Sequence, residues 1–177
     1  LAHVAAIDVL ADNERDRIGD VDGDGDLDLY VANYRVSTLR DVPFTRFTIS
    51  MVAGRPSVTT VNARPTTWPD LLGRFTVGAQ GGIIEHGQPD ALYRNDGRGN
   101  FALMSWTNGA FLDEDGTPLS IPYDFGLSVM MRDLNGDSAP DIYVCNDFDS
   151  EDRIWINRGN GTFQLIPRLA LRQTSLF

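Results

Sequence analysis

Two acidic stretches of the chain carry oxygen-bearing side chains at alternating positions. The first reads DVDGDGDLD from residue 20, and the second reads DLNGDSAPD from residue 133. Oxygen atoms spaced two residues apart in a tight bend converge on one point, which suits a hard divalent cation that takes about six to eight oxygen ligands. Positions 1, 3, 5 and 9 would offer side chains, and position 7 its carbonyl oxygen. The candidate ligands are Asp20, Asp22, Asp24, Asp26 and Asp28 in the first loop and Asp133, Asn135, Asp137, Ala139 and Asp141 in the second.

The ligand chemistry predicts calcium. Neither stretch contains a histidine or a cysteine, so the donor atoms are all oxygen, which disfavours zinc and copper. Without an ion, the clustered carboxylates would repel one another. The number of ligands and the flexibility of such loops favour Ca²⁺ over Mg²⁺. We therefore expect about two Ca²⁺ ions in this chain, one in each loop. The alternative is a pair of solvated, metal-free Asx turns.

The loops do not follow the pattern of an EF-hand. That motif needs a bidentate Glu at position 12, where this chain has Val31 and Val144. Both valines lie in runs rich in Tyr, Val and Ile, which are typical of strands. We therefore expect each ion to be held at a turn between two strands.

The loops belong to an internal repeat. Residues 20–33 align with residues 133–146 at an offset of 113, and residues 90–101 align with residues 152–163 at an offset of 62. The difference, 113 − 62 = 51, is the number of extra residues between the two motifs of the first copy. This places an insertion at residues 35–87, within the first repeat unit. The second repeat unit spans residues 124–167.

Each copy predicts four short antiparallel strands. An acidic loop leads into one strand, a second strand follows, and a turn rich in Gly and Asn precedes a returning strand that opens on Phe101 or Phe163. A further strand precedes the second loop. The expected strands lie at residues 29–32, 91–93, 124–131, 142–145 and 154–156, and the insertion adds residues 59–61 and 74–77. A unit of this size cannot bury both faces of its sheet, so copies must pack side by side as propeller blades do. The predicted fold is all-β: a β-propeller fragment of about two four-stranded blades with an irregular insertion.

Composition excludes several classes of protein. Of 177 residues, 21 are Asp and 4 are Glu, against 15 Arg and no Lys, and the net charge of −10 argues against a nucleic-acid partner. A hydrophobic content of 42% is enough for a packed core. No apolar run reaches the length of about 18 residues that a transmembrane helix needs.

We predict no catalytic residue. His3 and His86 are the only histidines, and neither lies beside a nucleophile. A carbohydrate-active enzyme, such as a polysaccharide lyase or hydrolase, would need an acid and a base, for which the insertion offers Asp41, Asp70, Glu85 and His86. The hairpin expected at residues 111–118 contains acids that we interpret as structural.

The run from Phe125 to Val129, followed by the second acidic loop, resembles an FG-GAP repeat, the blade unit of integrin-α-type β-propellers. The turn from Asn157 to Phe163 is similar to that of bacterial FG-GAP/VCBS-repeat proteins, including the cartilage-acidic-protein group. The resemblance covers about residues 18–34 and 88–167. It implies a propeller with calcium on one rim, in an exported protein used for adhesion or recognition of a protein or glycan ligand. Cys145–Asp147 replaces the usual Gly-Ala-Pro element.

Residues 1–177 are accordingly expected to form part of an FG-GAP-type propeller, since two blades cannot close a ring that needs at least about four. Both ends of the chain suggest an internal piece of a longer protein, with the rest of the propeller elsewhere. The resemblance implies a secreted, periplasmic or cell-surface location. The leading hypothesis is a calcium-binding recognition or adhesion module. The alternatives are the carbohydrate-active enzyme and a purely structural calcium-stabilised spacer.

Overall fold

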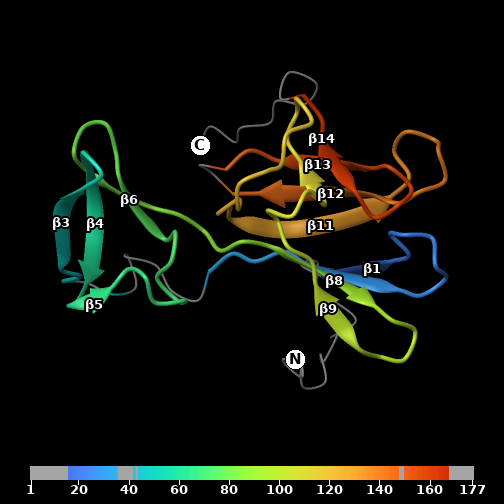
Figure 1. Ribbon diagram of the computed structural model, residues 1–177, viewed down its shortest axis with the longest axis horizontal. Coiled ribbons are helices and arrows are strands. Elements are labelled where there is room, and N and C mark those ends of the chain that lie inside the picture. Colours follow the sequence, from blue (N-terminus) through green and yellow to red (C-terminus); the bar gives the residue numbers. More distant parts are fainter. Residues whose placement is uncertain (1–15, 36–41, 43, 148–149, 168–177) are drawn as a thin grey trace.

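The computed structural model describes residues 16–35, 42, 44–147 and 150–167 (Figure 1). These residues form strands, turns and bends and contain no helix, and therefore no helix able to cross a membrane. The strands build two larger sheets and two small ones. The predicted all-β class is confirmed, and the arrangement is consistent with a fragment of a β-propeller.

The first larger sheet contains the strands predicted for the first copy of the repeat, together with a strand before the acidic loop that the sequence did not predict there. Its order is β1-β2-β8-β9, and every neighbouring pair is antiparallel. The insertion lies between β2 and β8, so two strands that are far apart in sequence pair directly. The strands are β1 (Asp16–Gly19), β2 (Asp28–Val31), β8 (Ala91–Asn95) and β9 (Phe101–Leu103).

The second larger sheet repeats this arrangement and adds a strand. Four antiparallel strands follow the repeat: β11 (Gly126–Arg132), β12 (Asp141–Asn146), β13 (Arg153–Asn157) and β14 (Phe163–Leu165). The fifth, β10 (Phe111–Leu112), pairs in parallel with β14 at the outer edge. The expected hairpin at residues 111–118 is present, with Leu112 bridging to Pro118. The parallel pairing was not predicted. It follows from Phe111, which is fully buried and stacks on Phe163 with 5.3 Å between ring centroids.

One hydrophobic core joins the two larger sheets. It combines Tyr30 and Leu92 of the first sheet with Ile142, Val144 and Trp155 of the second, and each of these side chains is at most 1% exposed. Aromatic rings extend this core outward, because Trp106 and Phe111 both contact Trp155. Neither sheet could bury these side chains alone, so the two sheets stabilise each other as adjacent blades.

The insertion folds into a compact unit of its own, which the sequence did not predict. Its strands are β3 (Phe47–Val52), β4 (Arg55–Val61), β5 (Arg64–Pro65), β6 (Phe75–Val77) and β7 (Ile83–Glu85). They form a three-stranded sheet and a separate hairpin. Val58, Val61, Leu71 and Phe75 make a second hydrophobic core. Figure 1 shows this unit to one side of the two blades.

Two glycines bring the insertion close to the segment that enters β11. A Cβ on Gly73 would overlap the ring of Tyr123, and a Cβ on Gly87 would overlap the carbonyl oxygen of Asp124. Beside this contact, Glu85 pairs with Arg35 at 3.1 Å and with Arg74 at 3.2 Å, and all three side chains are largely buried. The insertion is therefore held against the blades by close backbone approach and by a buried ion-pair cluster.

Candidate metal centre

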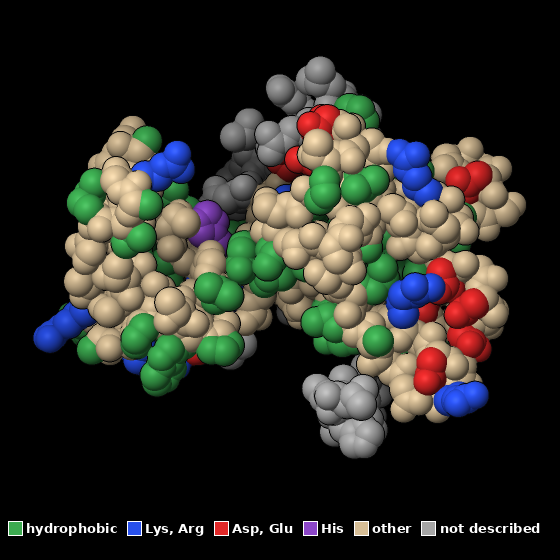
Figure 2. All heavy atoms as spheres, in the orientation of Figure 1, with side chains coloured by type: hydrophobic (Ala, Val, Ile, Leu, Met, Phe, Trp, Pro, Cys, Tyr) green, Lys and Arg blue, Asp and Glu red, His purple; other side chains and the backbone are tan. Residues whose placement is uncertain are grey.

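Both acidic loops connect the first two strands of a blade, and both lie at the end of the molecule away from the insertion (Figure 1). Figure 2 shows acidic side chains gathered at that end. The loop between β1 and β2 is closed by Asp20, whose Oδ1 accepts the N–H of Gly23 at 2.8 Å and whose Oδ2 accepts the N–H of Gly25 at 3.0 Å. Both glycines have positive φ, at 77° and 91°. The first acid thus fixes the bend of its own loop.

The second loop, between β11 and β12, repeats these bonds position by position. Asp133 Oδ1 accepts the N–H of Gly136 at 2.6 Å, and its Oδ2 accepts the N–H of Ser138 at 2.9 Å. The hydrogen bonds lower the pKa of the Asp133 carboxyl, with Ser138 as the largest contributor. The two stretches that align in sequence therefore have the same local fold.

The last acid of each loop is buried at the start of a strand. Asp28 Oδ2 accepts the N–H of Val21 and its Oδ1 that of Asn95, both at 2.9 Å. Asp141 makes the equivalent bonds to the N–H groups of Leu134 and Asn157, both at 2.8 Å. Burial raises the pKa of Asp28, and the nearby Asp24 and Asp20 raise it further, against the lowering effect of the two backbone hydrogen bonds. A cation would reverse this effect of burial.

Carboxylate oxygens of Asp20, Asp22 and Asp28 lie within 4.8 Å of one another. In the part of the chain that the structure describes, this is the one group of three such side chains that could hold a metal ion. Each hydrogen-bonded oxygen keeps a second lone pair, so the bonds to the loop backbone do not prevent coordination. The donor set fits a hard divalent cation, as the spacing of the acids predicts.

The other predicted ligands lie outside the group of Asp20, Asp22 and Asp28, or replace one of its carboxylates by another type of side chain. Asp24 lies outside this group, and its Oδ1 accepts the N–H of Asp26 at 2.9 Å. In the second loop Asn135 replaces Asp22, so an amide oxygen would take the place of a carboxylate. Asp137 Oδ1 accepts the N–H of Ala139 at 2.9 Å, as Asp24 does for Asp26. Coordination by Asp24 and Asp137, and by the carbonyls of Asp26 and Ala139, stays a prediction.

The first loop has a cationic neighbour at a position where the second blade has an apolar residue. Arg94 of β8 forms an ion pair with Asp22, whose side chain is only 5% exposed. The position that corresponds to Arg94 in the second blade, at an offset of 62, is Ile156. The two loops therefore differ in charge, because Asp22 and Asp26 of the first correspond to Asn135 and Ala139 of the second, and Arg94 corresponds to Ile156.

A buried amide connects the two loops. Asn157 Nδ2 donates to the carbonyl oxygen of Val21 in the first loop at 2.6 Å and to that of Pro140 in the second at 3.1 Å. The side chain of Asn157 is fully buried. The side-chain N–H of the corresponding Asn95 donates within its own blade, to the carbonyl oxygen of Leu27 at 3.2 Å.

Each blade contains a second carboxylate that sequence reasoning missed, which is buried in the first blade and half-buried in the second. Asp90 accepts the hydroxyl of Tyr30 at 2.8 Å and the N–H of Asn33 at 2.7 Å. Burial is the main cause that raises the pKa of Asp90 to about 6. In the second blade Tyr143 and the N–H of Asn146 donate to Asp152 in the same way, at 2.8 and 2.9 Å. The signal was present in the sequence, because all three residue types are identical in the two aligned copies. The carboxylates join the end of one strand to the start of the next.

Among the described residues, each acid or base that an enzyme in the insertion would need has another partner. Glu85 is engaged by Arg35 and Arg74, Asp70 is bound by Arg64 at 2.8 Å, and His86 Nε2 is 2.7 Å from the Thr76 hydroxyl. Asp41 lies outside the described residues. The described residues therefore place Glu85 and Asp70 beside arginines and His86 beside Thr76.

The fold and the loops define an all-β protein built from adjacent blades, each with an acidic turn at the same end. Residues 133–176 match the family model described as FG-GAP-like repeat, so this segment is an FG-GAP-like repeat. Comparisons with curated proteins and with solved structures give no significant match.

Proposed function

We propose that the chain is a calcium-stabilised part of a β-propeller that recognises a protein or glycan ligand. The observation that supports the calcium site best is the convergence of Asp20, Asp22 and Asp28 at one strand-to-strand turn. The identical backbone hydrogen bonds in the second loop extend the proposal to Asp133, Asn135 and Asp141. Recognition, an exported or cell-surface location and closure of the ring by further blades are proposed from the FG-GAP-like repeat.

The loops suit ion binding because their shape is already set. Asp20 and Asp133 hold the bends through backbone N–H groups, and Asp28 and Asp141 are fixed by the adjoining strand. A bound calcium ion would supply positive charge that offsets the repulsion among these carboxylates. Calcium loops of extracellular modules bind at about 10⁻⁴–10⁻³ M, so millimolar calcium outside the cell would keep such loops filled.

The proposal is tested by calcium titration and by thermal unfolding. We expect one ion per loop by calorimetry. With free calcium at about 100 times the dissociation constant, each filled site should stabilise the fold by about 2.7 kcal/mol relative to protein in chelator. Magnesium at the same concentration should give a smaller shift, because it prefers a stricter octahedral shell.

Asp22→Asn and Asp70→Asn form a matched pair for this test. Both remove one carboxylate, but Asp70 is exposed and lies in the insertion. The Asp22 variant should lose calcium affinity at one site, whereas the Asp70 variant should titrate like the parent chain. An unfolding midpoint that calcium leaves unchanged in the parent chain would refute the calcium proposal.

A further inference from the structure

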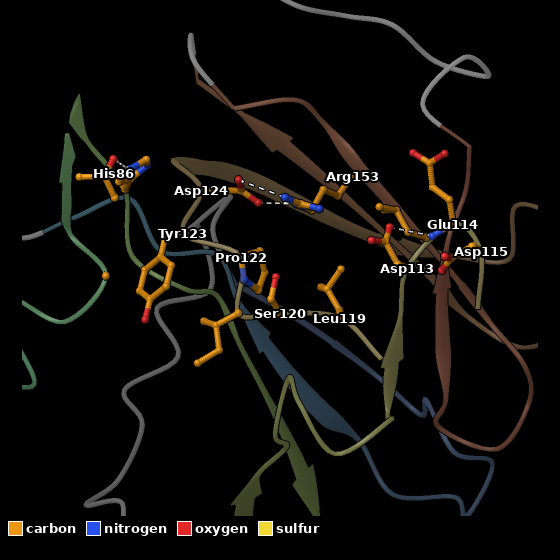
Figure 3. A pocket seen from close by; sticks show the side chains of 14 residues that line it. His86, Asp113, Glu114, Asp115, Leu119, Ser120, Pro122, Tyr123, Asp124 and Arg153 are labelled. Atoms are coloured by element: carbon orange, nitrogen blue, oxygen red, sulfur yellow. Dashed lines mark hydrogen bonds and ion pairs between the residues drawn. The ribbon is translucent and has the colours of Figure 1, made fainter. Parts of the chain in front are cut away.

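A pocket of about 850 Å³ lies where the insertion meets the second blade (Figure 3). Its walls come from three parts of the chain that are distant in sequence. The insertion supplies Gly73, Thr76 and His86, residues 113–124 supply most of the remaining wall, and the second blade supplies Arg153 and Leu165. This volume is within the range of about 300–1,000 Å³ that is usual for small-ligand pockets. The acidic loops do not contribute to it.

Backbone packing and hydrogen bonds hold the walls of the pocket in place. The ring of Tyr123 packs on the backbone of Gly73, and the carbonyl of Asp124 packs on Gly87, so the insertion and the segment before β11 are in close contact. On the opposite side, the turn of residues 113–117 is closed by the N–H of Asp113, which donates to the carbonyl of Thr117 at 2.8 Å. Gln164 of β14 donates to the carbonyl of Glu114 at 3.1 Å, which ties this turn to the second blade.

The walls combine hydrogen-bonding groups with apolar surface. Figure 3 shows His86 and Tyr123 on one side, the turn of Asp113 and Asp115 on the other, and the ion pair of Asp124 with Arg153 between them. Apolar side chains lie along the same wall, among them Leu119 and Pro122. Burial lowers the pKa of His86, which favours its neutral form; Nε2 of the ring lies 2.7 Å from the Thr76 hydroxyl, and Nδ1 can hydrogen-bond a ligand.

The charges narrow the class of ligand. Four carboxylates and one guanidinium line the pocket, so an anionic ligand would be repelled. A metal-ion site is also disfavoured, because the described residues of the pocket contain no group of three acidic side chains whose oxygen atoms lie within 4.8 Å of one another. Asp113 Oδ1 and Asp115 Oδ1 accept N–H groups of their own turn, from Glu114 at 2.8 Å and Thr117 at 3.0 Å, and each keeps a lone pair that can accept a hydroxyl group. Carboxylates with free lone pairs, a tyrosine and apolar side chains together suit a ligand that offers many hydroxyl groups and apolar C–H faces.

We propose that this pocket binds a neutral oligosaccharide. Carboxylates of the 113–115 turn would accept its hydroxyl groups, Arg153 would donate to its oxygen atoms, and the apolar side chains would contact its C–H faces. The inference rests on the proposed recognition function and gives it a location and a ligand class, independent of the calcium loops.

The test measures binding of neutral oligosaccharides to the whole chain, loaded with calcium, by array screening and then calorimetry. The probes are neutral gluco-, manno- and xylo-oligosaccharides, with oligogalacturonate as the anionic probe and spermidine as the cationic one. Ser120→Trp places a bulky side chain on the exposed wall of the pocket without touching either core. Ser50→Trp makes the same change on the exposed strand β3 of the insertion, outside the pocket lining, and serves as the control.

We expect saturable binding of at least one neutral oligosaccharide, weakened about tenfold or more by Ser120→Trp and unchanged by Ser50→Trp. Ligand-induced NMR shifts should include the ring signals of His86 and Tyr123, a readout that does not depend on any variant. The inference is overturned if no neutral probe binds at millimolar concentration, if only oligogalacturonate or spermidine binds, or if Ser120→Trp leaves the affinity unchanged. Because calcium is assayed separately by thermal unfolding, a failed calcium proposal and a failed pocket give different results.

Discussion

Gly25 and Ser138 occupy the same position of the two acidic loops, and both have left-handed backbone conformations, with φ of 91° and 73°. Each donates its N–H to the second carboxylate oxygen of the acid that opens its loop. A glycine adopts this conformation without steric cost, whereas a serine has a Cβ that opposes it. The second loop therefore reaches the shape of the first with some strain at Ser138.

Ser138→Gly should stabilise the protein by about 1 kcal/mol, because it removes this strain. Gly25→Ser should destabilise it by a similar amount, since nothing lies within 4 Å of the added Cβ and the backbone conformation is the main cost. Denaturant unfolding in chelator measures both changes without a contribution from calcium. A Ser138→Gly variant that is less stable than the parent chain would contradict the assignment of strain.

Arg94→Ile should strengthen calcium binding at the first loop. The guanidinium pairs with Asp22, and the second blade has Ile156 at the corresponding position. Removing a partly exposed positive charge should raise the affinity about threefold, an effect that falls as salt is added. Calorimetry at two ionic strengths would check this, and Arg98→Ile, in the following turn, provides the comparison.

Gly87→Ala should disturb the contact between the insertion and the blades. The added Cβ would overlap the carbonyl oxygen of Asp124, a backbone atom that cannot rotate away, and we expect a loss of about 1–3 kcal/mol in unfolding free energy. Gly82→Ala is the matched control, because Gly82 has no positive φ and no atom within 4 Å of an added Cβ. Equal stabilities of the two variants would show that the contact is not close in solution.

Asp90 should make stability fall as the pH rises from about 4 to 6. Its pKa is about 6 in the folded protein against 3.8 ordinarily, so the folded state holds the proton more tightly than the unfolded chain. Its contribution is complete below the ordinary pKa and is lost as the pH passes the folded value, by about 3 kcal/mol in total. Burial is the main cause that raises this pKa, and the other groups that act on it are the N–H of Asn33, Tyr30, Asp124 and Arg153.

Asp90→Asn isolates this effect, because an amide does not titrate. The difference in unfolding free energy between parent chain and variant should change across this pH window and stay constant above about pH 7. Other carboxyls, such as Asp133, have lowered pKa values and act in the opposite direction, so the difference between the two proteins is the quantity to measure. A difference that is flat between pH 4 and 7 would contradict a raised pKa.

The repeat explains why much of the fold could be predicted. Two copies of one pattern identify the strands, since a residue type that recurs at Tyr30 and Tyr143 reports a shared environment. The same comparison aligns the carboxylates Asp90 and Asp152. They lie outside the spacing of the metal ligands, so that spacing assigns them no role. Asp90 is bound by a tyrosine 60 residues away and Asp152 by one 9 residues away, and both partners lie outside the acidic loops, so the spacing within a loop cannot reveal them.

The insertion had no second copy with which to compare it. Its core brings together Val58, Leu71 and Phe75 from segments that proline and glycine interrupt. No long periodic pattern in the sequence therefore predicts this core. The parallel pairing of β10 was hidden for a related reason, because two residues are too few to show a period. The pocket could not be foreseen either, as Gly73 and Arg153 meet only through the fold.

The side-chain amide of Asn157 donates hydrogen bonds to both acidic turns and so couples their positions. Any shift of Val21 that accompanies filling of one turn must pull on the group that also holds Pro140 in the other. Titration curves should accordingly depart from those of two unrelated sites. If further blades carry the same asparagine, the rim of a complete ring would respond to calcium as a linked series.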